Sequence, residues 1–252
     1  MSNALTASLE HAAPAWLRAC DPRLRIVAAV LFAVVTVGLH QFTALLAAFG
    51  VALALALTAG PLPQLLRRAA PLEGFMLLLL LSLPFTVPGH TWFELGPLAA
   101  SHEGLSLALS IVLKAGAVAL MLFALLATLD MVVFGHALAR LRVPERLVHL
   151  FLFTVRYLDL LQDEYRRLRL AMRARAFVPR SDRHTWRSFG WLIGMLLVRS
   201  LERSQRILAA MKCRGFDGRL YLLDRQRWRG SDSGWAAVMG LLLGGLLWLD
   251  RL

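Results

Sequence analysis

The longest stretch that predicts a single span reads GLSLALSIVLKAGAVALMLFALLATL, from Gly104 to Leu129, and Lys114 is its only charged residue. An α-helix rises about 1.5 Å per residue, so about 20 apolar residues cross the hydrocarbon layer of a membrane. This stretch is therefore long enough to span a bilayer as one helix. Lys114 within it marks either a polar link between helices or a transport path, and we favour the polar link.

The rest of the chain repeats this apolar pattern. Hydrophobic residues make up 58% of the sequence and charged residues only 17%, which is more apolar than an ordinary soluble domain. Ile26–Thr58 is about twice the length of one crossing and is interrupted around His40, which predicts two short helices joined by a tight turn. Leu72–Val87 and Gly234–Leu249 are two further apolar runs. The predicted fold class is an all-α membrane protein with about five transmembrane helices.

The charges of the connecting segments predict an orientation. Arginines precede the first span and lie between the second and third spans, and a basic segment follows the fourth. The connections around His40 and over residues 89–103 contain no Lys or Arg. By the positive-inside rule, the N-terminus and the basic segment face the cytoplasm and the C-terminus lies outside. We expect a four-span membrane domain over residues 1–129, a basic cytoplasmic domain over residues 130–230, and a final transmembrane helix over residues 231–252.

The basic domain contains nearly all of the excess charge. It has 21 Lys or Arg residues against nine Asp or Glu, whereas the rest of the chain has seven of each kind. Its sequence predicts a short helix followed by two long helices, each mostly apolar in its first half and amphipathic and arginine-rich in its second. The expected helices run from Met131 to Arg142, from Glu145 or Arg146 to about Arg175, and from Thr185 to about Arg214.

The two long helices end in the same motif. The first copy, Arg167–Phe177, reads RLRLAMRARAF, and the second, Arg206–Phe216, reads RILAAMKCRGF. A helix breaker follows each, Pro179 in the first copy and Gly215 with Gly218 in the second. The matched residues at the ends of the copies are Ala174, Arg175, Ala176 and Phe177 in the first, and Cys213, Arg214, Gly215 and Phe216 in the second.

Two interpretations apply to Arg175 and Arg214. An arginine at a helix C-terminus is favoured by the helix dipole and by free carbonyls, without any partner. The repetition of the whole motif instead favours docking onto two binding sites of other proteins. Small neighbouring residues leave the guanidinium accessible, and its planar fork binds carboxylates or carbonyls bidentately. Phe177 and Phe216 then provide an apolar anchor beside each charge, a composition common at interface hot spots.

The sequence indicates no catalytic, cofactor or metal site. Its seven histidines and two cysteines have no metal-ligand spacing, and no nucleotide-binding or hydrolase motif occurs. A membrane enzyme that acts on anionic lipid is an alternative, but Asp159, Asp163 and Glu164 occupy helical ion-pair positions instead of forming an acid–base pair. A nucleic-acid anchor is disfavoured because the arginines alternate with Leu and Met on amphipathic helices.

The predicted i,i+4 ion pairs are Asp163–Arg167 and Glu202–Arg206.

At Ala174-Arg175-Ala176 and Cys213-Arg214-Gly215 the chain resembles the transmembrane T component of energy-coupling-factor (ECF) transporters, which are ATP-driven importers of vitamins and metal ions. The family signature is a pair of Ala-Arg-Gly motifs at the ends of two long cytoplasmic coupling helices. Each copy here departs from it at one small position, Ala176 or Cys213, and retains the arginine. The segment Ser200–Arg219, with Asp21-Pro22-Arg23 and Leu141–Glu145, is most similar to the cobalt-type members.

The resemblance implies a non-catalytic coupling subunit in the bacterial plasma membrane. Its partners would be two cytosolic ABC-type ATPases, which bind ATP and Mg²⁺, and a membrane subunit that captures the substrate. No cofactor is expected on this chain and no nucleic-acid partner. Arg175 and Arg214, with their neighbours in the motif, would each engage one ATPase. The apolar halves Leu147–Leu161 and Phe189–Leu201 would contact the capture subunit and the membrane helices. Cobalt is the expected cargo, with nickel or vitamins as alternatives.

Overall fold

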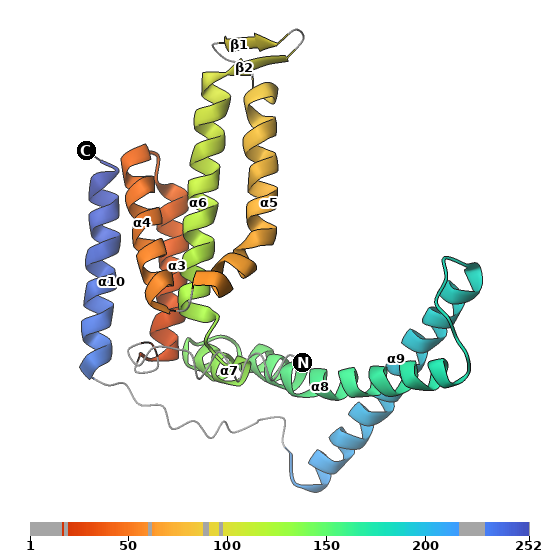
Figure 1. Cartoon of the computed structure of the whole chain (residues 1–252). Helices are drawn as coiled ribbons and strands as arrows, with labels where there is room; N and C mark the ends of the chain where they lie inside the picture. The colour runs from red at the N-terminus through yellow and green to blue at the C-terminus, as the bar shows by residue number, and fades with distance from the viewer. Residues whose placement is uncertain are drawn as a thin grey trace. The chain divides into compact units, whose positions relative to one another are not determined.

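Helices make up most of the chain in a computed structural model, which describes residue 17 and residues 20–59, 62–87, 91–95, 98–216 and 230–251 (Figure 1). The chain divides into two compact units, each of which is described here by itself. The first unit comprises the described residues of Met1–Phe134 and Gln226–Leu252, and the second those of Gly135–Arg225.

The first unit contains five of the described helices. They are α3 (Pro22–Gly38), α4 (Phe42–Ala59), α5 (Leu62–Thr86), α6 (His102–Leu126) and α10 (Gly230–Leu249). Among the described residues, three segments are long and apolar enough to cross a membrane, Phe42–Ala59, Glu103–Leu126 and Asp232–Leu249. The helical class is thereby confirmed, while five crossings remain a prediction, because α3 has only 17 residues and the apolar part of α5 is shorter still.

Two connections differ from the sequence-based expectation. Helix α5 begins at Leu62, so residues expected to form a loop before the third span are helical. Figure 1 shows the start of α5 turned away from the rest of the helix, and Pro71 inside it removes a backbone hydrogen bond, which bends a helix. Between α5 and α6, the strands β1 (Thr91–Leu95) and β2 (Leu98–Ser101) form an antiparallel hairpin where a loop was predicted. The aromatic and β-branched residues of β1 favour a strand.

Small residues bring α4 and α6 close together. Every fourth residue of α4 from Ala44 to Ala56 is an alanine with no exposed surface. On α6, Ala117 and Ala124 are equally buried, and a Cβ added at Gly116 would lie 3.0 Å from the ring of Phe49. In lipid there is little hydrophobic driving force between helices, so close packing at small residues supplies much of the association. By contrast, Gly240, Gly244 and Gly245 of α10 have open space around them and make no such contact.

The turn between α3 and α4 is held by two charged side chains from other elements. Lys114 Nζ donates a hydrogen bond to the carbonyl of Val37 at 2.9 Å, which makes Lys114 a polar link between helices. A carboxylate oxygen of Asp250, just after α10, accepts from the backbone N–H groups of His40 at 2.7 Å and Gln41 at 2.8 Å. These two hydrogen bonds lower the pKa of the Asp250 carboxyl from its usual value, and the bond from Gln41 has the larger effect.

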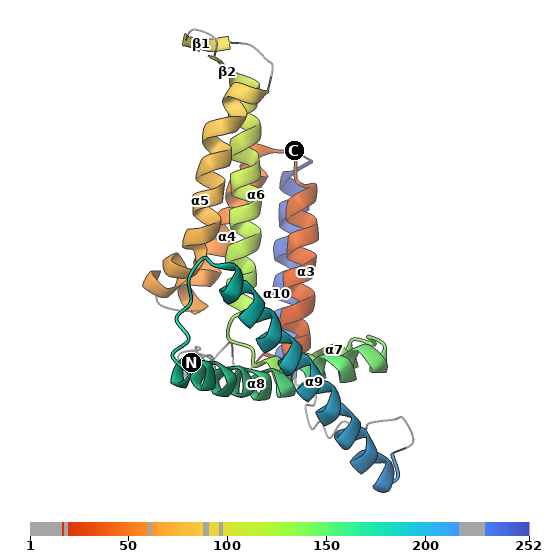
Figure 2. The ribbon, with the colours of Figure 1, turned by 90° about the vertical axis from the view of Figure 1, so that its right-hand side faces the viewer.

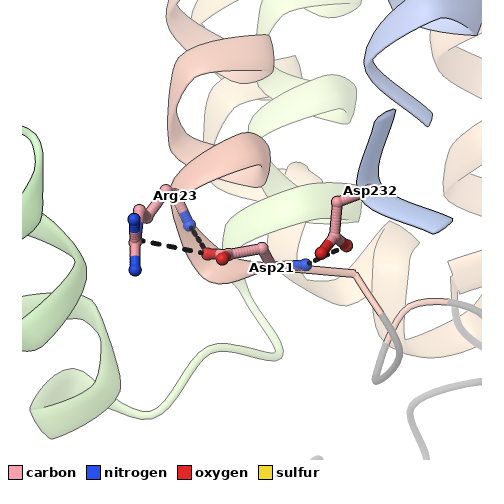
Figure 3. A network of polar contacts seen from close by, with 3 residues as sticks. All are labelled: Asp21, Arg23 and Asp232. Atoms are coloured by element: carbon pink, nitrogen blue, oxygen red, sulfur yellow. Dashed lines mark hydrogen bonds and ion pairs between the residues drawn. The ribbon is translucent and has the colours of Figure 1, made fainter. Parts of the chain in front are cut away.

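The opposite end of α3 carries a second polar cluster, shown in Figure 3. The Asp21 carboxylate accepts from the N–H of Arg23 at 2.9 Å and so caps α3. The N–H of Asp21 donates to Asp232 of α10 at 3.1 Å. Arg25, which is also buried, donates to the hydroxyl of Thr128 at 3.3 Å. The cluster therefore links the start of α3 to α10 and to the residues that follow α6.

The second unit is built on two long helices. After α7 (Met131–Arg140), whose last turns belong to this unit, come α8 (Glu145–Ala174) and α9 (Arg183–Cys213). Their ends lie within two residues of those predicted. Figures 1 and 2 show α8 and α9 crossing, and the carboxylate of Glu164 on α8 pairs with Arg199 on α9. Gly135 packs so closely on α8 that an added Cβ would lie 2.4 Å from Leu152.

Candidate functional site

The first copy of the repeated motif ends α8 with a specific hydrogen-bonded turn. Arg175 follows the last helical residue with φ −92° and ψ 23°, and Ala176 takes the left-handed conformation, with φ 58°. The N–H of Ala176 donates to the carbonyl of Arg173 at 3.0 Å, and the N–H of Phe177 donates to that of Met172 at 3.1 Å. These two bonds define a Schellman motif, which satisfies carbonyls left free at a helix C-terminus.

The second copy ends α9 with the same turn. Arg214 has φ −93° and ψ 12°, and Gly215 is left-handed with φ 79°. The N–H of Gly215 donates to the carbonyl of Lys212 at 3.0 Å, and the N–H of Phe216 donates to that of Met211 at 3.1 Å. The repetition in sequence is therefore a repetition in backbone geometry: each arginine occupies the cap position of an equivalent helix end.

This turn explains the small residue after each arginine. A left-handed residue suits glycine, because in any other residue the Cβ approaches the following carbonyl oxygen. Gly215 meets that requirement and Ala176 meets it only with strain. The sequence alone predicted that both are small residues that leave the guanidinium accessible, and that Pro179 breaks the first helix. The helix ends at Ala174, within one residue of the predicted end, and the turn at Ala176 terminates it before that proline is reached. A glycine one position after the helix cap is the sequence signal for such a left-handed turn. The second copy has this glycine, whereas the first has alanine at the equivalent position.

Substitutions at these two equivalent positions are expected to have opposite effects. Ala176→Gly removes the strain and should stabilise the end of α8 by about 1 kcal/mol, whereas Gly215→Ala should destabilise the end of α9 by about the same amount. Hydrogen–deuterium exchange of the last turn of each helix, measured in the full chain, checks both. Slower exchange near residue 172 in the first variant and faster exchange near residue 211 in the second are expected. The same sign of change in both variants would contradict the assignment.

The two guanidinium groups are accessible. Arg175 and Arg214 are exposed, as are the preceding residues Ala174 and Cys213. Among the described residues, neither guanidinium group has a hydrogen-bond or ion-pair partner. A cation at a helix C-terminus interacts favourably with the dipole, but that interaction leaves its donors free. Each helix end thus presents an unpaired planar fork of N–H donors to whatever contacts it.

The two phenylalanines of the motif make contacts within the second unit. The Phe177 ring lies 6.3 Å from that of His184 and 6.1 Å from that of Phe189, the latter edge to face. Both partners belong to the first turns of α9. Phe177 therefore fixes the end of α8 against the start of α9, and it is half-buried there. Phe216 is also half-buried and lines a groove that α8 and α9 share.

The shared groove is large and mainly apolar. Its volume is about 740 Å³, and the Glu164–Arg199 pair forms part of its wall. The middle of α8 and the middle and second half of α9 both contribute apolar side chains, which predicts contact with another apolar surface. The side chains from α8 are Phe153, Tyr157, Leu160, Leu161 and Glu164, and those from α9 include Leu196, Leu201, Ile207, Leu208 and Met211.

The acidic side chains near the arginines are engaged in ion pairs. Glu202 pairs with Arg206 at 3.9 Å, as predicted. Asp163 pairs with Arg166 at 3.5 Å, one position before the expected partner, because residues three apart also share a helix face. With Glu164 bound to Arg199, these carboxylates form charge pairs and not the acid–base pair that a lipid-cleaving enzyme would require. Within the described part of the chain, no three His, Cys, Asp or Glu side chains come together as a metal site would need.

Together these features define a class: a helical membrane protein whose separate helical unit presents two equivalent arginine-bearing helix ends. The family described as the cobalt transport protein CbiQ matches residues 14–222. The chain belongs to this family, that of the transmembrane T components of ECF transporters.

The names of two individual relatives agree with this assignment. The chain is 26% identical to the energy-coupling factor transporter transmembrane protein EcfT of Listeria innocua over 93% of its own length and 94% of the relative's. It is 27% identical to the cobalt transport protein CbiQ of Rhodobacter capsulatus over 76% of its own length and 82% of the relative's. An uncharacterized protein of Methanocaldococcus jannaschii is 26% identical over 82% of this chain and 80% of its own.

Proposed function

We propose that this chain is the coupling subunit of an ATP-driven importer, and that Arg175 and Arg214 each dock into one of two cytosolic ABC-type ATPases. The observation that carries the proposal is the equivalence of the two helix ends. Each has the same cap geometry and an exposed arginine whose guanidinium has no partner in the described part of the chain. Two equivalent ends fit two equivalent grooves, as a pair of related ATPases would supply.

The division of chemistry follows from this role. ATP and Mg²⁺ bind to the ATPases, and no catalytic group is required on this chain. When the ATPases close on ATP, they displace the ends of α8 and α9. Because these helices cross and are joined by the Glu164–Arg199 pair, a displacement at one end is transmitted to the other helix. The apolar groove and the apolar first half of α8 then contact the membrane subunit that captures the substrate.

Cobalt is the proposed cargo. The family description and the name of the R. capsulatus relative both favour it. The name of the L. innocua relative specifies no metal, which keeps nickel and vitamins as alternative cargoes. In the proposed orientation, the N-terminus and the second unit are cytoplasmic and the C-terminus is outside. The arginine-rich connections are then all cytoplasmic, as the positive-inside rule requires.

Thiol cross-linking tests the docking at both ends. Cys213 is exposed beside Arg214, so a short thiol-to-amine reagent can probe the second end without any substitution. In a Cys213→Ser background, Ala174→Cys probes the first end. Gly190→Cys is the matched control, because it is exposed on the same helix roughly 35 Å from residue 213. Cys20 is buried and can remain.

Membranes should contain this chain co-expressed with the ATPases and the capture subunit of its own organism. We expect residues 174 and 213, at the two helix ends, to form cross-links to an ATPase. Residue 190 should form no cross-link to an ATPase. Cross-links from only one end would reduce the proposal to a single docking point. Cross-links from neither end, with the complex intact, would contradict it.

A further inference from the structure

The first turns of α9 carry a basic and aromatic face on the side away from α8. We propose that this face, formed by Arg183, Trp186, Arg187, Gly190 and Trp191, lies in the headgroup region of the bilayer and binds anionic lipid. These residues recur at intervals of three and four, so they share one side of the helix. The proposal does not depend on the ATPase-docking role of the far end of α9.

The exposure of the two tryptophans indicates that this face contacts something other than water. Trp186 is 76% exposed and Trp191 is 69% exposed. On the other side of the same turns, Thr185 and Leu192 are buried and Phe189 contacts the ring of Phe177. The inward side of α9 is therefore already occupied, and the tryptophans belong to the outward side. An indole ring with an apolar body and one N–H donor is favoured where hydrocarbon meets water.

The residues that follow continue the apolar side without adding charge. Ile193, Leu197 and Val198 are 64%, 59% and 51% exposed, respectively. Gly190 and Gly194, on the same side of the helix, have open space where a Cβ would be placed. A helix with tryptophan and aliphatic residues on one side and arginine at its border has the composition of helices that lie in a membrane interface.

The charges at this end are complementary to anionic lipid. Arg180, Arg183 and Arg187 fall within eight residues, and Asp182 is the one acid among them. Arg183 and Arg187 are exposed and have no ion-pair partner among the described residues. Basic side chains near a bilayer are attracted to acidic headgroups within a Debye length of the surface.

The position of α9 in the chain connects it to membrane-spanning segments on both sides. The second unit is inserted between α6 and α10, and both of these helices contain a segment of membrane-spanning length. The unit is therefore tethered to the bilayer at both ends, and a tethered surface acts at a high effective concentration. Helix α9 has 31 residues, so its arginine-bearing end lies roughly 35–45 Å from this face and can bind a different partner.

Spin labelling of the full chain in lipid nanodiscs tests the proposal without any partner protein. A label is placed at Gly190→Cys, in a Cys213→Ser background, and a matched label at Gln205→Cys in the exposed second half of α9. Power saturation then compares access of oxygen, which concentrates in lipid, with access of a water-soluble nickel chelate. Nanodiscs of phosphatidylcholine alone and of phosphatidylcholine with phosphatidylglycerol supply the two lipid conditions.

We expect the ratio of oxygen to nickel access to be severalfold higher at residue 190 than at residue 205. The difference should grow with phosphatidylglycerol, and Arg183→Gln with Arg187→Gln should remove that growth. Trp186→Ala with Trp191→Ala should bring residue 190 to the level of residue 205. High nickel access at residue 190 would show a face in water, and low access to both probes would show a face covered by protein. Either result would overturn the proposal.

Discussion

The double variant Arg175→Glu with Arg214→Glu is expected to lose the ATPase subunits on purification while it still inserts into the membrane. Each substitution replaces a fork of N–H donors by a carboxylate, which repels the acidic or carbonyl acceptors that an arginine-binding groove provides. An interface arginine at a hot spot contributes about 2–4 kcal/mol, which corresponds to roughly 30-fold to 1000-fold in affinity. Loss at both ends therefore brings binding below detection. Co-purification from detergent-solubilised membranes measures this.

The single variants give information on how the two ends cooperate. One remaining end still binds, but the effective concentration that a second contact provides is lost. We expect each single variant to retain a reduced amount of ATPase. Arg175→Lys with Arg214→Lys should be intermediate, since lysine retains the charge and lacks the bidentate fork.

A charge-matched control separates docking from general electrostatics. Arg169→Glu with Arg206→Glu changes the net charge by the same amount on the same two helices, away from the caps. Both side chains are exposed, and the Arg206–Glu202 pair that is lost contributes little to stability. If this control lost the ATPases as completely as the cap variant did, binding would depend on the total charge and the helix ends would have no specific role.

The second large effect is expected from Ala48→Leu in the membrane unit. Ala48 has no exposed surface on the side of α4 that packs on α6, where buried alanines recur every fourth residue. A leucine there forces the two helices apart or into unfavourable rotamers, which costs about 1–3 kcal/mol. We expect a clear drop in the midpoint of thermal unfolding in detergent and a lower level of chain in the membrane.

Gly50→Leu is the matched control for this substitution. Gly50 lies two residues further along α4, is exposed, and has open space where a Cβ would be placed. The introduced side chain and the helix are the same, and the main difference is that position 48 is buried whereas position 50 is exposed. The control should retain or slightly raise the unfolding midpoint, because leucine favours a helix more than glycine does. Equal losses in both variants would contradict close packing of α4 on α6.

Sequence patterns predicted the helices well where a single local rule applies. The ends of α7, α8 and α9 were predicted to within two residues, because hydrophobic periodicity and a following Pro or Gly define a helix without outside help. The same rules were less successful around α5 and the β1–β2 hairpin. The helical conformation around the proline in α5 and the formation of the short strand β1 depend on neighbouring elements, which local sequence rules do not include.

The candidate site was predictable in its residues and not in its conformation. The repeated arginines are visible in the sequence, and so is Gly215 as a helix breaker. The left-handed conformation of Ala176 was not visible, since alanine rarely adopts it. Nor could the sequence indicate that Phe177 turns back onto His184 and Phe189, because that contact depends on the path of the chain between α8 and α9.

The sequence by itself determined the properties that depend on near neighbours: helices of membrane-spanning length, the basic segment, and two equivalent helix ends whose hydrogen bonds join residues no more than five positions apart. Only the tertiary structure decided which distant groups meet. Asp21 and Asp232 are 211 positions apart, and Lys114 reaches the carbonyl of Val37 on another helix. The physical reason is that a helix forms from local hydrogen bonds, whereas a buried polar group takes its partner from whichever helix packing places beside it.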